Sequence, residues 1–308
     1  MHGQACRRCF VQWGFAVSAA EYIPPATVSN ASGRIARTFA RLRSERVRGL
    51  IAYLTAGDPC PSRTVGLIRA LERGGADIVE LGVPFSDPIA DGPVIQRASD
   101  RALKAGTSVR TVLQLVRDLR ERSDVPIVVF SYLNPILRYG FERFADDAAR
   151  AGVDGALLID LGIEEAERYV REMRARGLDC IFLLTQTTRA ARIGQIADHC
   201  TGFVYLVSRA GVTGVRNSIS SDAIPLIERT RAATALPLAV GFGLSKREHM
   251  ESVAPYAEAA VVGSAFMRLV EQHASDGGLE GRLEALAAEL KSGLAVPHPD
   301  RDAQVGRR

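Results

Sequence analysis

The chain has 308 residues, of which 47% are hydrophobic and 24% charged, as in an ordinary soluble globular protein, and it is long enough for one large α/β domain. Its net charge of +4 comes from basic residues spread along the chain, which does not indicate a nucleic-acid-binding surface. No apolar run is long enough to cross a bilayer, and the five cysteines, widely spaced apart from Cys6 and Cys9, indicate neither a disulfide framework nor a metal site. We therefore expect a soluble, cytoplasmic protein without a metal.

The two ends of the chain lack the periodicity of helices or strands. Residues 1–32 include the pair Pro24-Pro25 and a polar stretch, and residues 294–308 form a polar tail that contains prolines. We expect both segments to be disordered. The remaining residues, 33–293, are predicted to form a single domain.

From residue 49 onward, apolar strand-like segments alternate with amphipathic helix-like segments. The strand-like segments are residues 50–54, 78–83, 127–130, 155–159, 180–184, 203–207, 238–241 and 259–262. Eight short strands separated by helices match a (β/α)8 barrel better than an open doubly wound sheet, which usually has fewer strands and a glycine-rich first turn. We therefore predict a (β/α)8 TIM barrel.

Three further helices stand outside the eight β–α pairs. Between residues 34 and 48, apolar residues recur at helical spacing, which predicts an N-terminal surface helix with one buried stripe that plugs or flanks the barrel. An extra helix over residues 109–122 is inserted after the second β–α unit. A terminal amphipathic helix covers residues 279–290.

The second strand carries a carboxylate in an otherwise apolar run. Because side chains alternate along a strand, Glu80 shares its face with Gly82, which leaves room beside it. An unpaired buried carboxylate is costly, and the proline-stiffened loop that follows adds Asp87 and Asp91. Three acids near one strand's carboxyl end indicate a pocket. The alternative is an edge strand followed by a polar turn.

Glycine turns follow the sixth, seventh and eighth predicted strands. Phosphate commonly binds after the last two strands of such a barrel, where backbone N–H groups beside a helix amino terminus suit a dianion. The sequence therefore favours a phosphorylated substrate. The predicted phosphate-binding residues are Gly214, Gly243, Gly263 and Ser264.

The motifs that carry these residues resemble those of the tryptophan synthase alpha chain family. They are the runs 80–88 and 90–93, Thr55-Ala56-Gly57-Asp58-Pro59, and residues 208–214. The resemblance implies a lyase of tryptophan biosynthesis that cleaves indole-3-glycerol phosphate to indole and glyceraldehyde 3-phosphate. It implies no cofactor in this chain, and a partner beta chain that carries pyridoxal phosphate in an alpha2-beta2 complex.

The resemblance also implies roles for individual residues. Glu80 matches the family's acid/base, and burial would raise its pKa and keep a proton available near neutrality. Asp91 matches a second carboxylate that stays ionised, holds the indole N–H and offsets positive charge on the ring. The hydroxyl of Tyr205 would reach Glu80, and Thr213 would latch Asp91 in a closed site. The positions that resemble the indole pocket are Tyr53, Phe130, Tyr132, Leu157, Ile159, Thr213 and Phe242.

Other interpretations of the same residues remain open. A different phosphate-binding barrel enzyme, such as a ribosyl-phosphate isomerase, would need its acid and base at other strand ends. A non-catalytic barrel that activates a beta chain would need neither Glu80 nor Asp91, and a stand-alone lyase that releases indole would need both. Asn134 and Pro135 resemble a segment that touches the beta chain in the family. Gly162 departs from the family, which usually has a proline there, and this questions the stiffness of the turn rather than activity.

Overall fold

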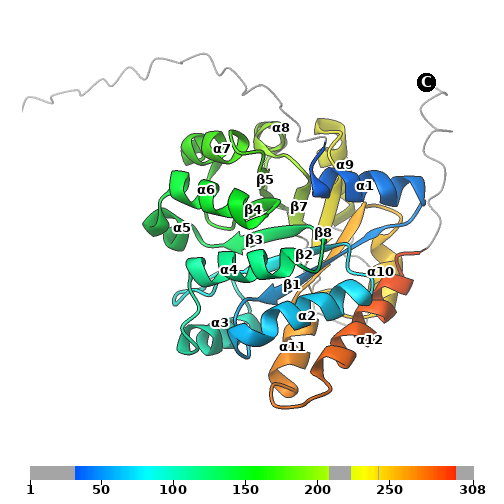
Figure 1. Cartoon of the computed structure of the whole chain (residues 1–308). Helices are drawn as coiled ribbons and strands as arrows, with labels where there is room; N and C mark the ends of the chain where they lie inside the picture. Colours follow the sequence, from blue (N-terminus) through cyan, green and yellow to red (C-terminus); the bar gives the residue numbers. More distant parts are fainter. Residues whose placement is uncertain (1–31, 208–222, 242, 296–308) are drawn as a thin grey trace, which may run out of the picture.

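A computed structural model describes residues 32–207, 223–241 and 243–295. Its parallel strands form one sheet in the order β5-β4-β3-β2-β1-β9-β8-β7-β6, wound into a barrel (Figure 1). The strands are β1 (Gly49–Thr55), β2 (Ile78–Gly82), β3 (Ile127–Ser131), β4 (Gly155–Leu158), β5 (Asp179–Ile181), β6 (Leu183–Thr185), β7 (Val204–Val207), β8 (Leu238–Gly241) and β9 (Ala259–Val262). The predicted barrel is confirmed.

The prediction of one continuous fifth strand over residues 180–184 was wrong. The segment is interrupted at Phe182, so that β5 pairs with β4 and β6 pairs with β7. The two ends of the sheet are therefore successive pieces of the same chain, and the barrel closes through this break. Hydrophobic alternation does not show the interruption, because both pieces are apolar and differ only in their hydrogen-bonding partner.

The helices surround the barrel (Figure 1). They are α1 (Arg34–Ser44), α2 (Pro61–Arg73), α3 (Pro93–Lys104), α4 (Val109–Arg120), α5 (Leu133–Tyr139), α6 (Phe141–Ala151), α7 (Glu167–Arg174), α8 (Ala190–His199), α9 (Ala223–Ala233), α10 (Arg247–Val253), α11 (Ser264–Gln272) and α12 (Leu279–Ser292), with a 3-10 turn at Ile163–Glu165. The three additional helices are confirmed as α1, α4 and α12. The first two end earlier than predicted, at Ser44 and Arg120. The division of the segment after β3 into α5 and α6, at Gly140, was not predicted.

Helix α1 plugs one end of the barrel. Its buried side chains Ile35, Phe39 and Leu42 join a cluster made by the inward-facing residues of the strands. The rings of Phe39 and Phe203 lie 5.9 Å apart between centroids. The predicted apolar stripe of this helix therefore completes the inner core of the barrel.

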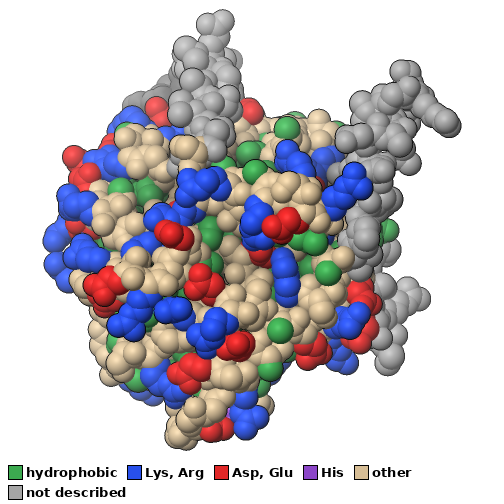
Figure 2. All heavy atoms as spheres, turned by 45° about the vertical axis from the view of Figure 1, so that its right-hand side comes forward, with side chains coloured by type: hydrophobic (Ala, Val, Ile, Leu, Met, Phe, Trp, Pro, Cys, Tyr) green, Lys and Arg blue, Asp and Glu red, His purple; other side chains and the backbone are tan. Residues whose placement is uncertain are grey.

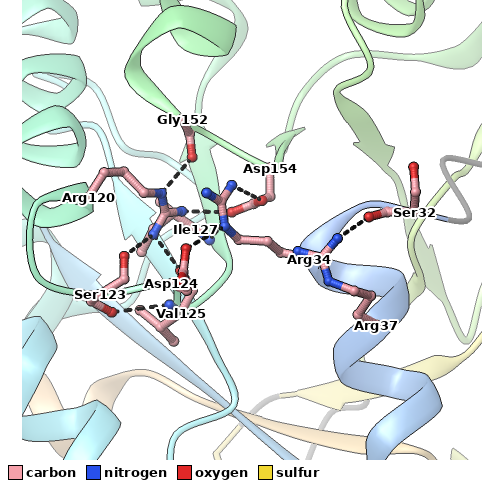
Figure 3. Close-up of polar contacts among 10 residues, drawn as sticks. All are labelled: Ser32, Arg34, Arg37, Arg120, Ser123, Asp124, Val125, Ile127, Gly152 and Asp154. Atoms are coloured by element: carbon pink, nitrogen blue, oxygen red, sulfur yellow. Dashed lines mark hydrogen bonds and ion pairs between the residues drawn. The ribbon is translucent and has the colours of Figure 1, made fainter.

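Ion pairs hold α1 against the amino ends of the strands. A functional site is therefore expected at the opposite end, where the carboxyl ends of the strands lie. Arg34 of α1 contacts Asp154, just before β4, with 3.2 Å between Nη1 and Oδ1. Arg120 of α4 binds the other oxygen of Asp154 at 2.8 Å, and the backbone N–H of Ile127 donates to it as well (Figure 3). Arg41 makes the corresponding contact with Asp77, before β2, at 2.7 Å.

The outer face of the barrel is covered by the helices, and their exposed sides are charged. The alternate, outward-facing strand residues and the apolar faces of the helices form a second core cluster. On the face seen in Figure 2, Lys and Arg side chains are interspersed with Asp and Glu. Within the described ranges, no helix combines the length and apolarity needed to cross a membrane.

Candidate active site

Glu80 projects from β2 into the barrel, as the strand's alternation predicts. Its neighbour two residues earlier, Ile78, belongs to the inner cluster, whereas Val79 and Leu81 pack in the outer one. Only 1% of Glu80 is exposed, and its Oε1 atom has no hydrogen-bond partner among the described residues. A buried carboxyl oxygen without a partner is a cost to the fold that a functional role would explain.

Two tyrosines occupy space that glycines leave open beside Glu80. A Cβ on Gly82 would lie 2.3 Å from the Tyr53 hydroxyl, and a Cβ on Gly241 would lie 2.4 Å from the Tyr205 hydroxyl. Both contacts are impossibly short, so each glycine is required for the tyrosine on the neighbouring strand to face inward. Tyr53 also packs edge-to-face on Phe130, with ring centroids 5.4 Å apart.

Asp91 lies in the loop between β2 and α3, next to this interior. The backbone N–H of Ala90 donates to the Tyr132 hydroxyl at 2.9 Å. The Gln96 side-chain amide of α3 donates to the Asp91 carbonyl oxygen at 2.9 Å. The loop is thus fixed on both sides of the Ala90–Asp91 peptide. Gln96 was not identified from the sequence, because one amide in the first turn of a helix has no distinguishing pattern.

The two acids differ in environment. Burial raises the pKa of Glu80 to about 8, so this carboxyl retains its proton near neutrality. Burial also raises the pKa of Asp91, but a hydrogen bond from Tyr132 opposes it and the pKa stays at about 6, so Asp91 is mainly ionised at pH 7. The barrel mouth therefore combines a protonated and an ionised carboxyl group, an arrangement suited to acid/base work.

The charges of these acids also affect the pKa values of two nearby tyrosines. Burial, and then the charges of Asp91 and Glu80, raise the pKa of Tyr53. Burial and the charge of Glu80 likewise raise the pKa of Tyr205. Both phenols therefore lie near the carboxyl groups and remain protonated donors at neutral pH.

The remaining predicted site residues fall into two groups. Phe130 and Ile159 are partly buried and pack against the inner cluster, whereas Leu157 is fully buried within it. Their contact with a substrate remains a prediction. Thr213, Gly214 and Phe242 lie outside the described residues.

The predicted phosphate end lies at the carboxyl ends of β8 and β9. Gly263 and Ser264 open helix α11, whose first backbone N–H groups have no carbonyl partner within the helix. Gly243 has a φ of +71°, a left-handed conformation that favours glycine. Gly263 also lies next to Tyr53, since a Cβ there would be 3.4 Å from the Cβ of Tyr53. The helix amino terminus and the acids therefore share one end of the barrel.

An apolar groove of about 250 Å³ borders the Asp91 loop. It is lined by Phe85, Asp87, Ile89, Tyr132, Leu133, Asn134, Leu137 and Asp160. Ile89 is 89% exposed and Leu137 is 54% exposed. Exposed large apolar side chains around a groove are typical of an interaction surface.

No cluster of three or more His, Cys, Asp or Glu side chains that could hold a metal ion occurs within the part of the chain that the structure describes. The polar groups of the barrel mouth are carboxyls, phenols and backbone amides. Such a set can transfer a proton, hold an N–H group and bind an anion. It therefore suits acid/base chemistry on a phosphorylated compound.

Comparison with known proteins identifies close relatives. A family model described as tryptophan synthase alpha chain matches residues 39–294. The chain is 59% identical over 263 residues to the tryptophan synthase alpha chain of Solibacter usitatus strain Ellin6076, covering 85% of this chain and 98% of the relative. It is 47% identical over 261 residues to that of Geotalea uraniireducens strain Rf4, covering 85% and 97%.

Solved structures agree with the sequence relatives. Tryptophan synthase subunit alpha from Legionella pneumophila str. Paris is similar with a TM-score of 0.79 and 38% identity, over 85% of this chain and 98% of that one. A chain of ligand-free M. tuberculosis tryptophan synthase is similar with a TM-score of 0.78 and 35% identity, over 86% and 100%.

Proposed function

The chain belongs to the tryptophan synthase alpha chain family, and from this we propose how its barrel mouth performs the alpha reaction. The chain is a lyase of tryptophan biosynthesis that cleaves indole-3-glycerol phosphate to indole and glyceraldehyde 3-phosphate. It carries no cofactor for this step, since pyridoxal phosphate belongs to the beta chain of the complex. The individual steps therefore fall to side chains and backbone amides of the barrel mouth.

The reaction is a retro-aldol cleavage and needs two linked proton movements. The indole ring becomes a leaving group once its C3 carbon is protonated. The hydroxyl on the adjacent glycerol carbon loses its proton as the carbon–carbon bond breaks, which leaves an aldehyde. The proton count balances, because one proton is delivered to carbon and one is removed from oxygen.

Glu80 is the proposed acid/base for both transfers. The observation that carries this assignment is the unpartnered, buried Oε1 atom on a carboxyl group whose pKa is raised to about 8. Such a group has a proton to give near neutrality and, once ionised, is a base strong enough to take one back. Tyr205, held beside it by the space at Gly241, is the proposed neighbour that donates to Glu80 when it is ionised.

Asp91 is the proposed anchor of the indole N–H. Protonation at C3 places positive charge on the ring nitrogen, and an ionised carboxylate beside that nitrogen stabilises the transition state. The pKa of about 6 keeps Asp91 mainly ionised under the conditions in which Glu80 is protonated. The different environments therefore support different roles for the two acids.

The remaining contacts are proposed from the sequence motifs and the resemblance to the family. Tyr53, Phe130, Tyr132, Leu157 and Ile159 are the proposed walls of the indole pocket. The phosphate is proposed to rest on the backbone N–H groups at Gly243, Gly263 and Ser264, with Gly214 completing the site. Phe242 and Thr213 complete the proposed pocket and latch.

The partner of the chain is a tryptophan synthase beta chain. We expect the groove beside the Asp91 loop to face it, because exposed Ile89 and Leu137 flank a groove that includes Asn134. A cytoplasmic location is also proposed, because the chain is a biosynthetic enzyme and no helix in the described ranges could span a membrane.

The test is to mix the purified protein with indole-3-glycerol phosphate and to measure indole release, with and without a beta chain. Cleavage by the chain alone would show a self-sufficient lyase. Cleavage only with the beta chain would show that the partner completes the site. No cleavage in either mixture, with tryptophan formed normally from added indole, would refute the proposed reaction and leave a non-catalytic activator.

A further inference from the structure

We propose that Tyr132 and Gln96 are positioning residues for Asp91, which clamp the backbone of its loop from the end of β3 and from helix α3. This rests on the role proposed for Asp91. The sequence assigned Tyr132 only to the pocket wall and assigned nothing to Gln96.

The loop that carries Asp91 has little internal structure. Between β2 and α3, its own backbone bonds include one from the Ile89 N–H to the Asp87 carbonyl at 2.9 Å and one from the Asp91 N–H to the Pro88 carbonyl at 3.0 Å. Ile89 is almost fully exposed at the loop tip. A loop with so few bonds of its own depends on neighbouring elements to place a side chain accurately.

Tyr132 supplies the first point of attachment. It follows β3 directly, is 3% exposed, and accepts the Ala90 N–H at 2.9 Å. Its ring packs on Phe85 with centroids 5.1 Å apart, which fixes the hydroxyl in place. Because the hydroxyl oxygen accepts from Ala90, its own proton is free to be donated to the Asp91 carboxylate, and this hydrogen bond lowers the pKa of Asp91.

Gln96 supplies the second point. Its Nε2 atom donates to the carbonyl oxygen of Asp91 at 2.9 Å and to that of Pro88 at 3.4 Å. Helix α3 starts only two residues after Asp91, with Pro93 at its first position, so the amide reaches back to the loop over a rigid helical turn. The N–H of Ala90, one residue before Asp91, and the carbonyl after the Cα of Asp91 are therefore held by two separate elements.

The two attachments differ in what they contact, and this makes them separable by experiment. Tyr132 contacts both the loop backbone and the carboxylate, whereas the hydrogen bonds of Gln96 to described residues go to backbone carbonyls. Among the described residues, the titratable groups that face Asp91 are Tyr132, at the end of β3, and Tyr53, on β1, and the charge of Asp160 acts on Tyr132. Loss of the Tyr132 hydroxyl should thus raise the pKa of Asp91, and loss of the Gln96 amide should not.

The experiment measures indole formation from indole-3-glycerol phosphate by Tyr132→Phe and Gln96→Met in the complex with the beta chain, between pH 5 and 9. Misplacement of a reacting group by about 1 Å costs on the order of 10²-fold. We expect kcat to fall roughly 10-fold to 100-fold in each variant with a smaller change in KM. The acidic limb of the pH profile should move to higher pH in Tyr132→Phe and stay in place in Gln96→Met.

Matched controls are available elsewhere in the chain. Tyr139→Phe removes a hydroxyl that donates to Asp147 at 2.6 Å, and Gln114→Met removes an amide that donates to Asp118 at 2.7 Å, and neither residue is among those proposed for the site. Both should keep the parent rate and profile. A parent-like kcat in Tyr132→Phe and Gln96→Met would overturn the proposal that these residues position Asp91. A raised KM with an unchanged kcat would overturn it too, and would show that Tyr132 acts only as a wall of the pocket. Asp91→Asn separates the two proposals, because an active Asp91→Asn would instead refute the role of Asp91.

Discussion

Replacing Glu80 with Gln should make the fold more stable while it removes most of the turnover. Burial raises the pKa of Glu80 from 4.5 to about 8, so the folded chain holds this proton more tightly than the unfolded chain does. The contribution of the bound proton to stability is fully present below pH 4.5 and is lost as the pH rises through 8. A Gln side chain is never ionised and avoids that loss.

The magnitude follows from the size of the shift. One pKa unit corresponds to about 1.36 kcal/mol, and pH 7 lies about 2.5 pH units above the pKa of 4.5 in the unfolded chain. The parent should therefore be less stable than Glu80→Gln by about 3 kcal/mol at pH 7. At pH 5 the difference should shrink to about 1 kcal/mol. A chain of this size gains about 2 °C in Tm per kcal/mol, so the variant should melt ~6 °C higher at pH 7.

The assay is urea unfolding of the parent and Glu80→Gln at pH 5, 6, 7 and 8. Other titrating groups, Asp91 included, are common to both proteins and cancel in the difference. The exposed Glu121 provides a control, because Glu121→Gln makes the same substitution on the surface, where stability should change little. A stability difference between parent and Glu80→Gln that is constant across the pH range would show that Glu80 is not desolvated as described.

Further substitutions address the rest of the site. Asp91→Asn should lower kcat by roughly 10²-fold or more through lost charge stabilisation, and a rate within a few-fold of the parent in steady-state assays would argue against its role. Gly263→Val should raise KM for the phosphorylated substrate while the binding of uncharged indole analogues is little changed. Equal weakening of both would place the phosphate elsewhere. Gly263 is a cleaner test than Gly243, because its φ of −122° allows a side chain whereas a valine at φ +71° is strained. Deletion of residues 1–32 should leave activity and Tm unchanged, and a large drop in either would assign this segment to the fold. Thr213→Val should be stimulated less by a saturating beta chain than the parent is, and equal stimulation would reject the latch.

The inward orientation of Glu80 was predictable because it depends only on the period of a strand and on a glycine that leaves room. The barrel was predictable for a similar reason, since eight apolar runs separated by helices leave few alternatives. In both cases the sequence contains a repeating pattern that local geometry converts directly into structure.

The interruption at Phe182 and the contact of Gln96 were not predictable in this way. Each depends on which other part of the backbone lies next to the residue in the fold. For the broken strand this is β4 on one side of the break and β7 on the other, and for the Gln96 amide it is the carbonyl of Asp91. The double role of Tyr132 was missed for the same reason. Its pocket position came from the resemblance, but its hydrogen bond to Ala90 depends on the path of a loop without regular structure.

The central claim is that Glu80 moves the protons of the cleavage, and the most direct measurement is the single-turnover rate of indole formation by Glu80→Gln in the complex with the beta chain. The amide cannot exchange the protons on which the reaction depends, so the rate should fall by roughly 10²-fold to 10⁴-fold. The substrate dissociation constant should stay within a few-fold of the parent value. A single-turnover rate within a few-fold of the parent, in a variant that binds substrate normally, would contradict the assignment.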